Sequence, residues 1–265
     1  MDKVIGLWSK TNRWHRGLLI FLIIELRLIP ARQRGFTCND PALSYTFNGD
    51  TITMKHLFGT ILLLPLAVML ITERKYHQSE TITPKKQSLR WYKEYIFGLL
   101  VNLIAVQGLK LIVGAPRPHF FDTCSPIEAQ TCQGGEFVAR YSCTKPPHWS
   151  SECGKSFPSG HTALAVHAGV FIAYYLYRRA TKSSIVYSSQ AVLLLSTVYC
   201  GVSRMMDHRH HWWDVLGGAT LALPILLYTI FYLCKNFEAR TQKIPDDSEK
   251  KINSDLSDNV PSIES

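Results

Sequence analysis

KSFPSGHTALAVHAGVFIAYYLY, residues 155–177, opens with a lysine, two serines, a glycine and a histidine and continues as an apolar run. A helix that begins near residues 158–160 exposes backbone N–H groups that have no partner within the helix. The helix dipole adds partial positive charge at the same end, so this start is suited to binding an anion. Gly160 allows close approach of the backbone, and Ser159 can donate its hydroxyl. An ordinary helix cap uses the same residue types, so the stretch alone leaves both interpretations open.

Apolar segments like this one recur along the chain. They lie at residues 14–30, 56–72, 93–113, 162–178, 185–202 and 213–234. Each is close to the ~20 residues that a helix needs to span a bilayer, and the first carries Glu25 and Arg27 before Pro30. Buried helices of a soluble protein are the alternative, which six segments separated by short basic or cysteine-bearing loops disfavour. The sequence therefore predicts an all-α integral membrane protein with six transmembrane helices.

The 265 residues carry a formal net charge of +9, and the basic residues gather in particular loops. They do not form a patch interleaved with aromatic side chains, so no nucleic-acid partner is expected. The positive-inside rule places both termini in the cytoplasm and residues 31–55, 114–160 and 203–212 outside or in a lumen. Residues 1–240 are expected to form the membrane domain. Residues 241–265 are expected to be a disordered cytoplasmic tail.

Four of the seven cysteines lie in the longest segment that is assigned to the outside. These are Cys124, Cys132, Cys143 and Cys153, and Cys38 in the first outer segment is a fifth candidate. Disulfides are permitted on that side, but the sequence does not choose among the pairings. Free thiols are the alternative. Zinc is disfavoured because the chain has no C-x-x-C pair.

Three polar clusters interrupt the apolar segments. They are KLIVGAPRP at 110–118, KSFPSGH at 155–161 and SRMMDHRHHWWD at 203–214. Each lies at the end of a predicted helix, and in the six-span topology all three reach the same face of the membrane. The topology therefore permits a single shared site.

Three cations of these clusters, Lys110, Arg117 and Arg204, are costly to hold at a membrane boundary without a partner. Arginine presents a planar fork that suits phosphate oxygens, and lysine acts as a point charge. A basic residue at a helix end often extends its charge toward water instead. Three such residues on one face, beside histidines, favour a phosphate site.

Histidines and a carboxylate complete the candidate chemistry. If the last span is already helical at His210, then Asp214 lies on the same face and can orient the imidazole as a nucleophile. His161 is placed to protonate a leaving oxygen. His211 is three residues from Asp214, so spacing alone leaves it as a rival nucleophile. A metal site is the other interpretation, but no familiar ligand spacing appears and the surrounding cations oppose one. Its ligands would be His208, His210 and His211 with Asp207 or Asp214.

Together the clusters read K-x6-R-P, P-S-G-H and S-R-x5-H-x3-D, and they resemble the three-part signature of type 2 phosphatidic acid phosphatases, the lipid phosphate phosphatases. RGFTCNDPALSY, residues 34–45, also resembles the family's first outer loop. The likeness extends over roughly residues 15–235.

The resemblance implies a six-helix membrane hydrolase that needs no metal and no cofactor and acts at the exoplasmic or lumenal face. It implies His210 as nucleophile, Asp214 as its orienting partner and His161 as the acid, with a phosphohistidine intermediate. It implies that phosphate or substrate is bound by Lys110, Arg117, Pro118, Ser159, Gly160 and Arg204. The expected substrates are phosphatidate, lysophosphatidate, sphingosine 1-phosphate and ceramide 1-phosphate.

The same chemistry is compatible with a transferase of phospho-headgroups, a sugar- or prenyl-phosphate phosphatase, or a non-catalytic lipid-binding relative. The intact signature disfavours the last of these. The expected partners are the membrane and the lipid phosphate, and a homo-oligomer remains open. The plasma membrane is the first expectation for the location, with endomembranes as the alternative.

Overall fold

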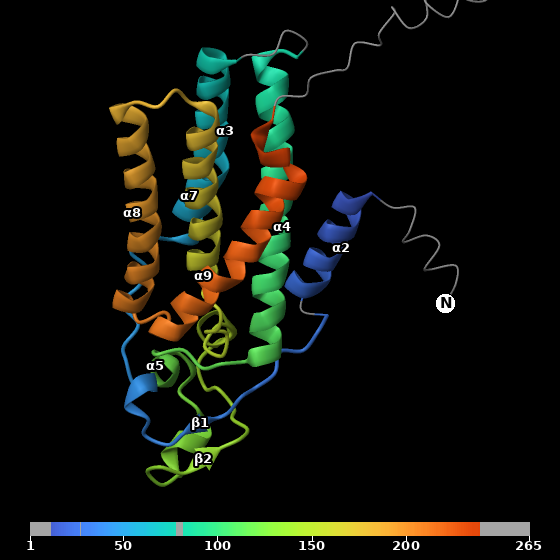
Figure 1. Ribbon diagram of the computed structural model, residues 1–265. Coiled ribbons are helices and arrows are strands. Elements are labelled where there is room, and N and C mark those ends of the chain that lie inside the picture. The colour runs from blue at the N-terminus through green and yellow to red at the C-terminus, as the bar shows by residue number, and fades with distance from the viewer. Residues whose placement is uncertain (1–11, 27, 78–81, 239–265) are drawn as a thin grey trace, which may run out of the picture.

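The computed structural model describes residues 12–26, 28–77 and 82–238 as a bundle of helices with a small loop-rich unit at one end (Figure 1). The predicted tail at 241–265 lies outside the described residues. Each predicted apolar segment overlaps one helix, so the mostly helical architecture is confirmed. In chain order the helices are α2 (Arg13–Glu25), α3 (Met54–Tyr76), α4 (Pro84–Val113), α7 (Gly160–Arg179), α8 (Ser184–Met206) and α9 (Trp212–Leu227), which continues as the π-helix η3 (Tyr228–Leu233).

In the described part of the chain, four helices are long and apolar enough to cross a membrane. They are α3, α4, α8 and α9 together with η3. The helix α2 has 13 residues and ends at Glu25, short of the predicted limit at residue 30. A proline at position 30 disfavours helical backbone in the residue before it, which agrees with this early end. The structure is that of a multi-pass membrane protein, and the count of six spans stays a prediction.

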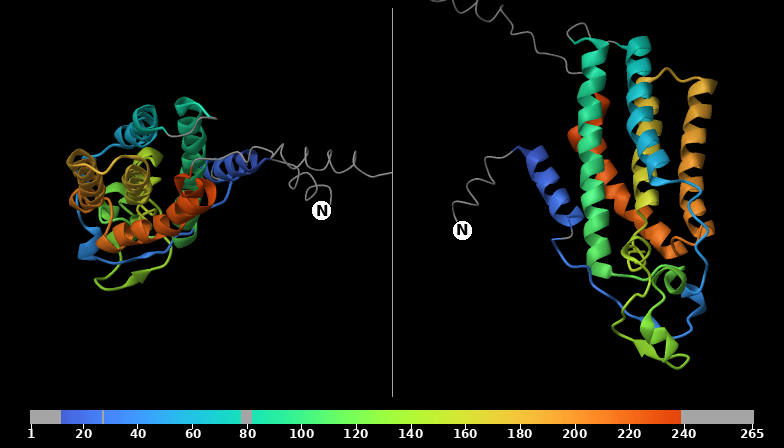
Figure 2. Two further views of the ribbon diagram at one scale, coloured as in Figure 1. Left: turned by 45° about the horizontal axis from the view of Figure 1, so that its top comes forward. Right: turned by 180° about the vertical axis from the view of Figure 1, so that it is seen from behind.

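Helix α7 lies at the centre of the bundle and packs against α3, α4, α8 and α9 (Figure 2). Among the described helices, α7 is not one of the four that are apolar enough to cross a membrane, which agrees with its interior position because neighbouring helices rather than lipid cover most of its surface. Phe171 and Tyr175 of α7 pack with Trp91 and Tyr95 of α4 and with Phe237 in one aromatic core. This core fixes the central helix from which the second polar cluster begins.

A buried ion pair joins α3 to α7 at the end of the bundle opposite that cluster. Arg179 donates from Nε and Nη2 to the two carboxylate oxygens of Glu73, at 2.9 and 3.0 Å. The hydroxyl of Tyr175 donates to the same carboxylate at 3.0 Å. The guanidinium also lies over the ring of Trp91, with 5.0 Å between its carbon and the ring centroid. These contacts lock the last turn of α7 against α3.

The loop-rich unit combines the first outer segment with the long loop between α4 and α7. A two-residue antiparallel pair, β1 (Phe36–Thr37) with β2 (Phe137–Val138), joins the two segments. Phe36, Phe120 and Tyr141 form a small aromatic core beneath this pair. The remaining elements of the unit are η1 (Pro41–Leu43), α5 (Phe120–Cys124), η2 (Ile127–Gln130) and α6 (Pro147–Ser150).

Two disulfides hold this unit together and give the pairing that the sequence left open. Cys38 pairs with Cys132, which attaches the first outer segment to the long loop, and Cys124 pairs with Cys143. Cys153 stays a buried free thiol, whose pKa burial raises to about 11. The unit is therefore a covalently closed cap over the ends of the helices.

Candidate active site

The three polar clusters meet at the ends of α4, α7, α8 and α9, beside the loop-rich unit (Figure 1). Backbone hydrogen bonds join them directly. The N–H of Arg117 donates to the carbonyl of Cys153 at 2.8 Å, and the N–H of Ser159 donates to the carbonyl of Asp214 at 2.9 Å. The structure thus brings together clusters that lie up to about a hundred residues apart in the sequence.

The start of α7 is capped by Ser159, whose hydroxyl oxygen accepts a hydrogen bond from the N–H of Thr162. Gly160 follows as the first helical residue. A Cβ atom placed on Gly160 would lie 3.7 Å from Nζ of Lys110, so the ammonium group sits close to the helix start. The ammonium group of Lys110 and the positive end of the α7 dipole therefore lie next to each other, and an anion bound there would offset their mutual repulsion.

Arg117 adds a second cation with unused donors. Its side chain is 4% exposed, and its buried Nε has no hydrogen-bond partner among the described residues. Nη2 lies 3.5 Å from a carboxylate oxygen of Glu152, which makes a weak ion pair. Burial, and then the nearby charge of Arg209, lower the pKa of Arg117 to about 10. A buried donor without a partner is costly, so this group is suited to receiving a ligand oxygen.

Arg204 is fully buried and, unlike Arg117, has a protein partner for each of its three guanidinium nitrogens. Its Nη1 donates to Asp50 at 2.8 Å, its Nη2 pairs with Asp207, and its Nε donates to the hydroxyl of Ser203. Asp50 also pairs with Nε of Arg209 at 3.1 Å. A carboxylate from the first outer segment therefore bridges two guanidinium groups of the third cluster.

His161 is held by the same outer segment. Its Nε2 lies 3.0 Å from the carbonyl oxygen of Ile52. A carbonyl only accepts hydrogen bonds, so Nε2 carries the proton in this contact, and Nδ1 is left to exchange a proton with another group. The tautomer of His161 is thus set by a backbone carbonyl.

His210 and Asp214 lie close together but not on one helical face. Helix α9 begins at Trp212, with His211 as its N-cap, so His210 precedes the helix. Nδ1 of His210 lies 3.9 Å from Oδ2 of Asp214, longer than a hydrogen bond. Catalytic hydrogen bonds are often this long in the absence of substrate. The helical geometry assumed from the spacing was wrong, because the turn before α9 brings the two groups together instead.

Both ring nitrogens of His211, the rival nucleophile, contact protein groups. Nδ1 of His211 lies 3.3 Å from Oδ2 of Asp214, and its Nε2 lies 3.2 Å from the carbonyl of Ala42. The ring also stacks on Trp213, with 4.4 Å between centroids. His210, by contrast, has a buried Nδ1 with no hydrogen-bond partner among the described residues. Of the two, His210 is the one with nitrogens available for chemistry.

Other residues contribute contacts that spacing did not reveal. The hydroxyl of the buried Ser156 donates to Oδ2 of Asp214 at 2.6 Å, and the N–H of His211 donates to the same oxygen at 2.9 Å. Asp50 was missed because nothing in its local sequence marks it. Ser156 could have been noticed, since it lies within the quoted cluster.

Pro118, which was predicted to bind substrate, contributes its carbonyl to a hydrogen bond from the N–H of Tyr45.

The donors needed for a metal do not converge at this site. Within residues 12–26, 28–77 and 82–238, the only cluster of three or more potential ligands is that of Cys124, Cys143 and Cys153. Two of these cysteines form a disulfide with each other. The alternative of a histidine and aspartate metal centre therefore gains no support from the geometry.

The bundle of apolar helices carries two histidines, a carboxylate and buried cations at one end. This combination defines a membrane-embedded enzyme that acts on phosphate esters. Residues 91–238 match the PAP2 superfamily, and the chain belongs to this family of type 2 phosphatidic acid phosphatases. It is a phosphoric monoester hydrolase of the phosphatidate phosphatase type.

The chain is similar to curated phosphatases of animals. It is 30% identical over 229 residues to the phospholipid phosphatase homolog 1.2 homolog of Caenorhabditis elegans, covering 78% of this chain and 67% of the relative. It is 29% identical over 237 residues to phospholipid phosphatase 2 of Mus musculus, covering 84% and 83%. A putative phosphatidate phosphatase of Drosophila melanogaster is 26% identical over 257 residues, covering 85% and 66%.

Proposed function

We propose that the chain removes phosphate from lipid phosphate monoesters at the exoplasmic or lumenal face of the membrane, through a phosphohistidine and without a metal ion. Phosphatidate, lysophosphatidate, sphingosine 1-phosphate and ceramide 1-phosphate are the proposed substrates. The observation that carries the proposal is that His161 and His210 lie at the same end of the bundle as Lys110 and the buried Nε of Arg117, which has no hydrogen-bond partner among the described residues.

The first step is attack by neutral His210 on phosphorus. A nitrogen–phosphorus bond forms as the bond to the lipid oxygen breaks. His161 enters this step as an imidazolium, protonated at both ring nitrogens, and gives its Nδ1 proton to the departing alkoxide. Asp214 stabilises the positive charge that develops on His210, and Ser156 holds that carboxylate in place. The hydrogen bond from Nε2 to Ile52 keeps the other nitrogen of His161 directed to the leaving group.

In the second step His161 acts as a base, and the nitrogen of His210 becomes the leaving group. His161 takes a proton from water at Nδ1, the oxygen attacks phosphorus, and the bond to His210 breaks to release phosphate. Negative charge builds on the phosphoryl oxygens in both steps. That charge is stabilised by Lys110, by Arg117 and by the N–H groups at the start of α7. The start of α7 is formed by Ser159 and Gly160. Preorganised donors of this kind are worth on the order of 10²–10³ in rate each.

Arg204 contributes to phosphate binding after an exchange of partners. Asp50 and Asp207 neutralise its guanidinium in the absence of substrate. A guanidinium has five N–H donors, so a phosphate oxygen can join the network or replace Asp50. The second arginine that Asp50 bridges, Arg209, lies beside the proposed nucleophile in the sequence and adds to the positive potential.

The disulfides and the basic residues support the proposed orientation. Cys38–Cys132 and Cys124–Cys143 close the cap at the site's end of the bundle, and disulfides persist in oxidising compartments. Arg178 and Arg179 lie at the opposite end, as the positive-inside rule expects for the cytoplasmic face. With this orientation we keep the proposals of six spans, a single membrane domain over residues 1–240 and the plasma membrane as the location.

Release of inorganic phosphate from purified protein in detergent tests the proposal. Each of the four lipids is assayed with excess EDTA, and vanadate is added as an inhibitor that adopts the five-coordinate geometry of the transferring phosphorus. Turnover that survives EDTA and is blocked by vanadate is expected. Activity that EDTA abolishes and magnesium restores would contradict metal independence, and a new phospholipid in place of free phosphate would identify a transferase.

A further inference from the structure

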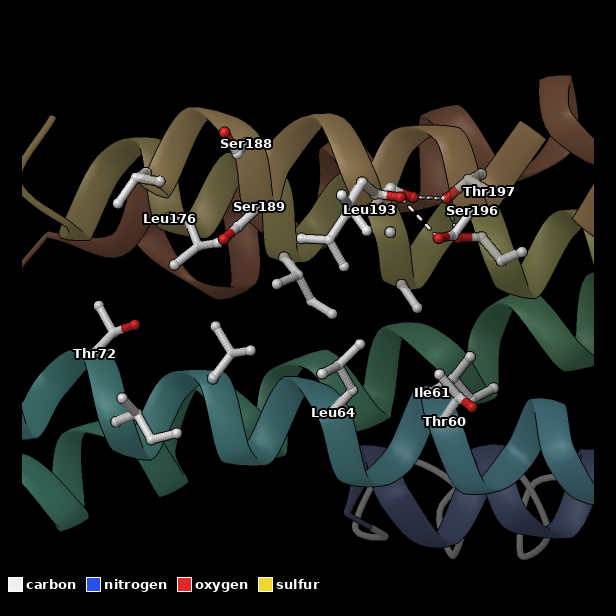
Figure 3. A pocket seen from close by; sticks show the side chains of 18 of the residues that line it. Thr60, Ile61, Leu64, Thr72, Leu176, Ser188, Ser189, Leu193, Ser196 and Thr197 are labelled. Atoms are coloured by element: carbon white, nitrogen blue, oxygen red, sulfur yellow. Dashed lines mark hydrogen bonds between the residues drawn. The ribbon is translucent and has the colours of Figure 1, made fainter. Parts of the chain in front are cut away.

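An apolar groove of about 1110 Å³ lies between α3 and α8, with α7 as its floor (Figure 3). Both wall helices pack against α7, and the groove separates their facing side chains. It extends from Ile52 and His56 at the site's end to Lys75 and Tyr76 at the other. Along α8 it runs from Cys200 to Ser184, about 24 Å at 1.5 Å per residue. That length exceeds the ~15 Å of one leaflet of the hydrocarbon core.

Small side chains on α7 create the groove. Ala165, Ala168 and Gly169 form its floor in the half nearer the site, whereas Leu176 lies in the far half. A Cβ atom on Gly169 would collide with the hydroxyl of Thr197, so the glycine lets α8 approach α7 closely. The smallest side chains of the floor thus lie in the half of the groove nearer the candidate active site.

Several hydroxyl groups that line the groove donate to backbone carbonyls of their own helix, among them those of Thr60 and Ser189. Ser196 donates to the carbonyl of Val192 at 2.7 Å, and Thr197 donates to the carbonyl of Leu193 at 2.9 Å, both within α8 (Figure 3). Opposite them, Ile61 and Leu64 of α3 face across the gap. A hydrocarbon chain would therefore meet mainly apolar atoms and break no hydrogen bond.

The groove continues from the proposed acid, His161. One face of α7 carries residues 161, 165, 168, 172 and 176, because they follow one another at intervals of three or four. His161 heads this row, and the other four line the groove. Ile52, whose carbonyl binds Nε2 of His161, lies in the lining at the mouth. The same helical face thus carries the proposed acid and the floor of the groove.

The direction of the displacement at phosphorus determines on which side of that atom the lipid lies. In an in-line displacement the leaving oxygen departs opposite the nucleophile. The lipid body is attached to that oxygen, so it must lie on the side of His161 and away from His210. We propose that a hydrocarbon chain of the lipid phosphate substrate occupies the α3–α7–α8 groove. The inference rests on the proposed function and adds where the substrate's chain is held.

A photoreactive substrate analogue tests the occupant directly. The probe is a non-hydrolysable phosphonate analogue of lysophosphatidate that carries a diazirine near the methyl end of its chain. Irradiation with the full-length wild-type protein should label the groove faces of α3, α7 and α8, and excess phosphatidate should suppress the labelling. Competable labelling on α4 or α9 instead would overturn the proposal, as would labelling that phosphatidate does not reduce.

Adjacent leucines on α3 give a matched pair of variants. Leu64 lines the groove and is 38% exposed, whereas Leu63 is 70% exposed and is not part of the lining. Leu64→Trp narrows the groove, so it should lower kcat/KM for oleoyl lysophosphatidate about tenfold relative to a butanoyl analogue. That factor corresponds to about 1.4 kcal/mol, within the range for overpacking. Leu63→Trp should leave the ratio of the two substrates unchanged.

The two proposals fail in different ways. If the wild-type protein releases phosphate from no lipid, the proposed function is wrong. If it hydrolyses both chain lengths and Leu64→Trp alters their ratio no more than Leu63→Trp does, the function stands and the groove does not hold the chain.

Discussion

Replacing Ser156 by alanine removes a hydrogen bond that the proposed mechanism needs. The hydroxyl is fully buried and donates to Oδ2 of Asp214 at 2.6 Å. A hydrogen bond to a charged group contributes about 1.5–3 kcal/mol. If Asp214 acts mainly in the transition state, this loss corresponds to a decrease of roughly 10- to 150-fold in kcat/KM. The serine is thus a test of whether this carboxylate must be held in place.

The assay is phosphate release from phosphatidate in mixed micelles, with the unfolding temperature measured on the same preparation. Ser150→Ala is the matched control, because that hydroxyl donates to the carbonyl of Pro146 and not to the site. Ser156→Ala should lose activity while most of the protein stays folded at the assay temperature, and Ser150→Ala should match the wild type. Wild-type kcat/KM in folded Ser156→Ala protein would refute the reasoning.

Three further predictions concern pH, stability and redox state. Burial lowers the pKa of His210 well below 6.5, and the nucleophile attacks when neutral, so protonation of His210 should cause no fall in kcat/KM between pH 7 and 6.5; an acid limb centred above pH 7 would contradict this. Arg179→Ala removes the guanidinium partner of the buried Glu73 and leaves that carboxylate only Tyr175 and His77, so it should destabilise the fold by up to about 3–5 kcal/mol in denaturant titrations; an unchanged midpoint would show that the pair is dispensable. Cys38→Ser should lower the unfolding temperature by opening the link to Cys132, and equal stability with the wild type would count against that disulfide.

The helices and the meeting of the clusters were accessible from the sequence because they depend on periodic or local signals. Apolar length predicted six helical segments, and the polar start of the segment at 162–178 predicted a helix that begins near residues 158–160, as α7 does at Gly160. The length of α2 was overestimated, because hydropathy alone does not register where the helix ends.

Contacts between distant segments were not accessible in this way. The bond from Ser156 to Asp214 joins residues 58 positions apart, and Asp50 reaches Arg204 across 154 positions. Cysteine pairing depends on how the outer segments fold, which spacing does not encode. The relation of His210 to Asp214 was misjudged geometrically because a helix was assumed to begin before the actual start at Trp212.

Trapping the phosphoenzyme tests the central claim, that His210 carries the phosphoryl group. Protein incubated briefly with a lipid carrying radiolabelled phosphate is quenched, digested and mapped by mass spectrometry. His208→Ala is the control, since that side chain is half-buried and packs against Tyr45 and the carbonyl of Thr46. An acid-labile label on His210, retained in His208→Ala and lost with all turnover in His210→Ala, is predicted. A label on another residue, or near wild-type turnover in folded and inserted His210→Ala protein, would contradict the account.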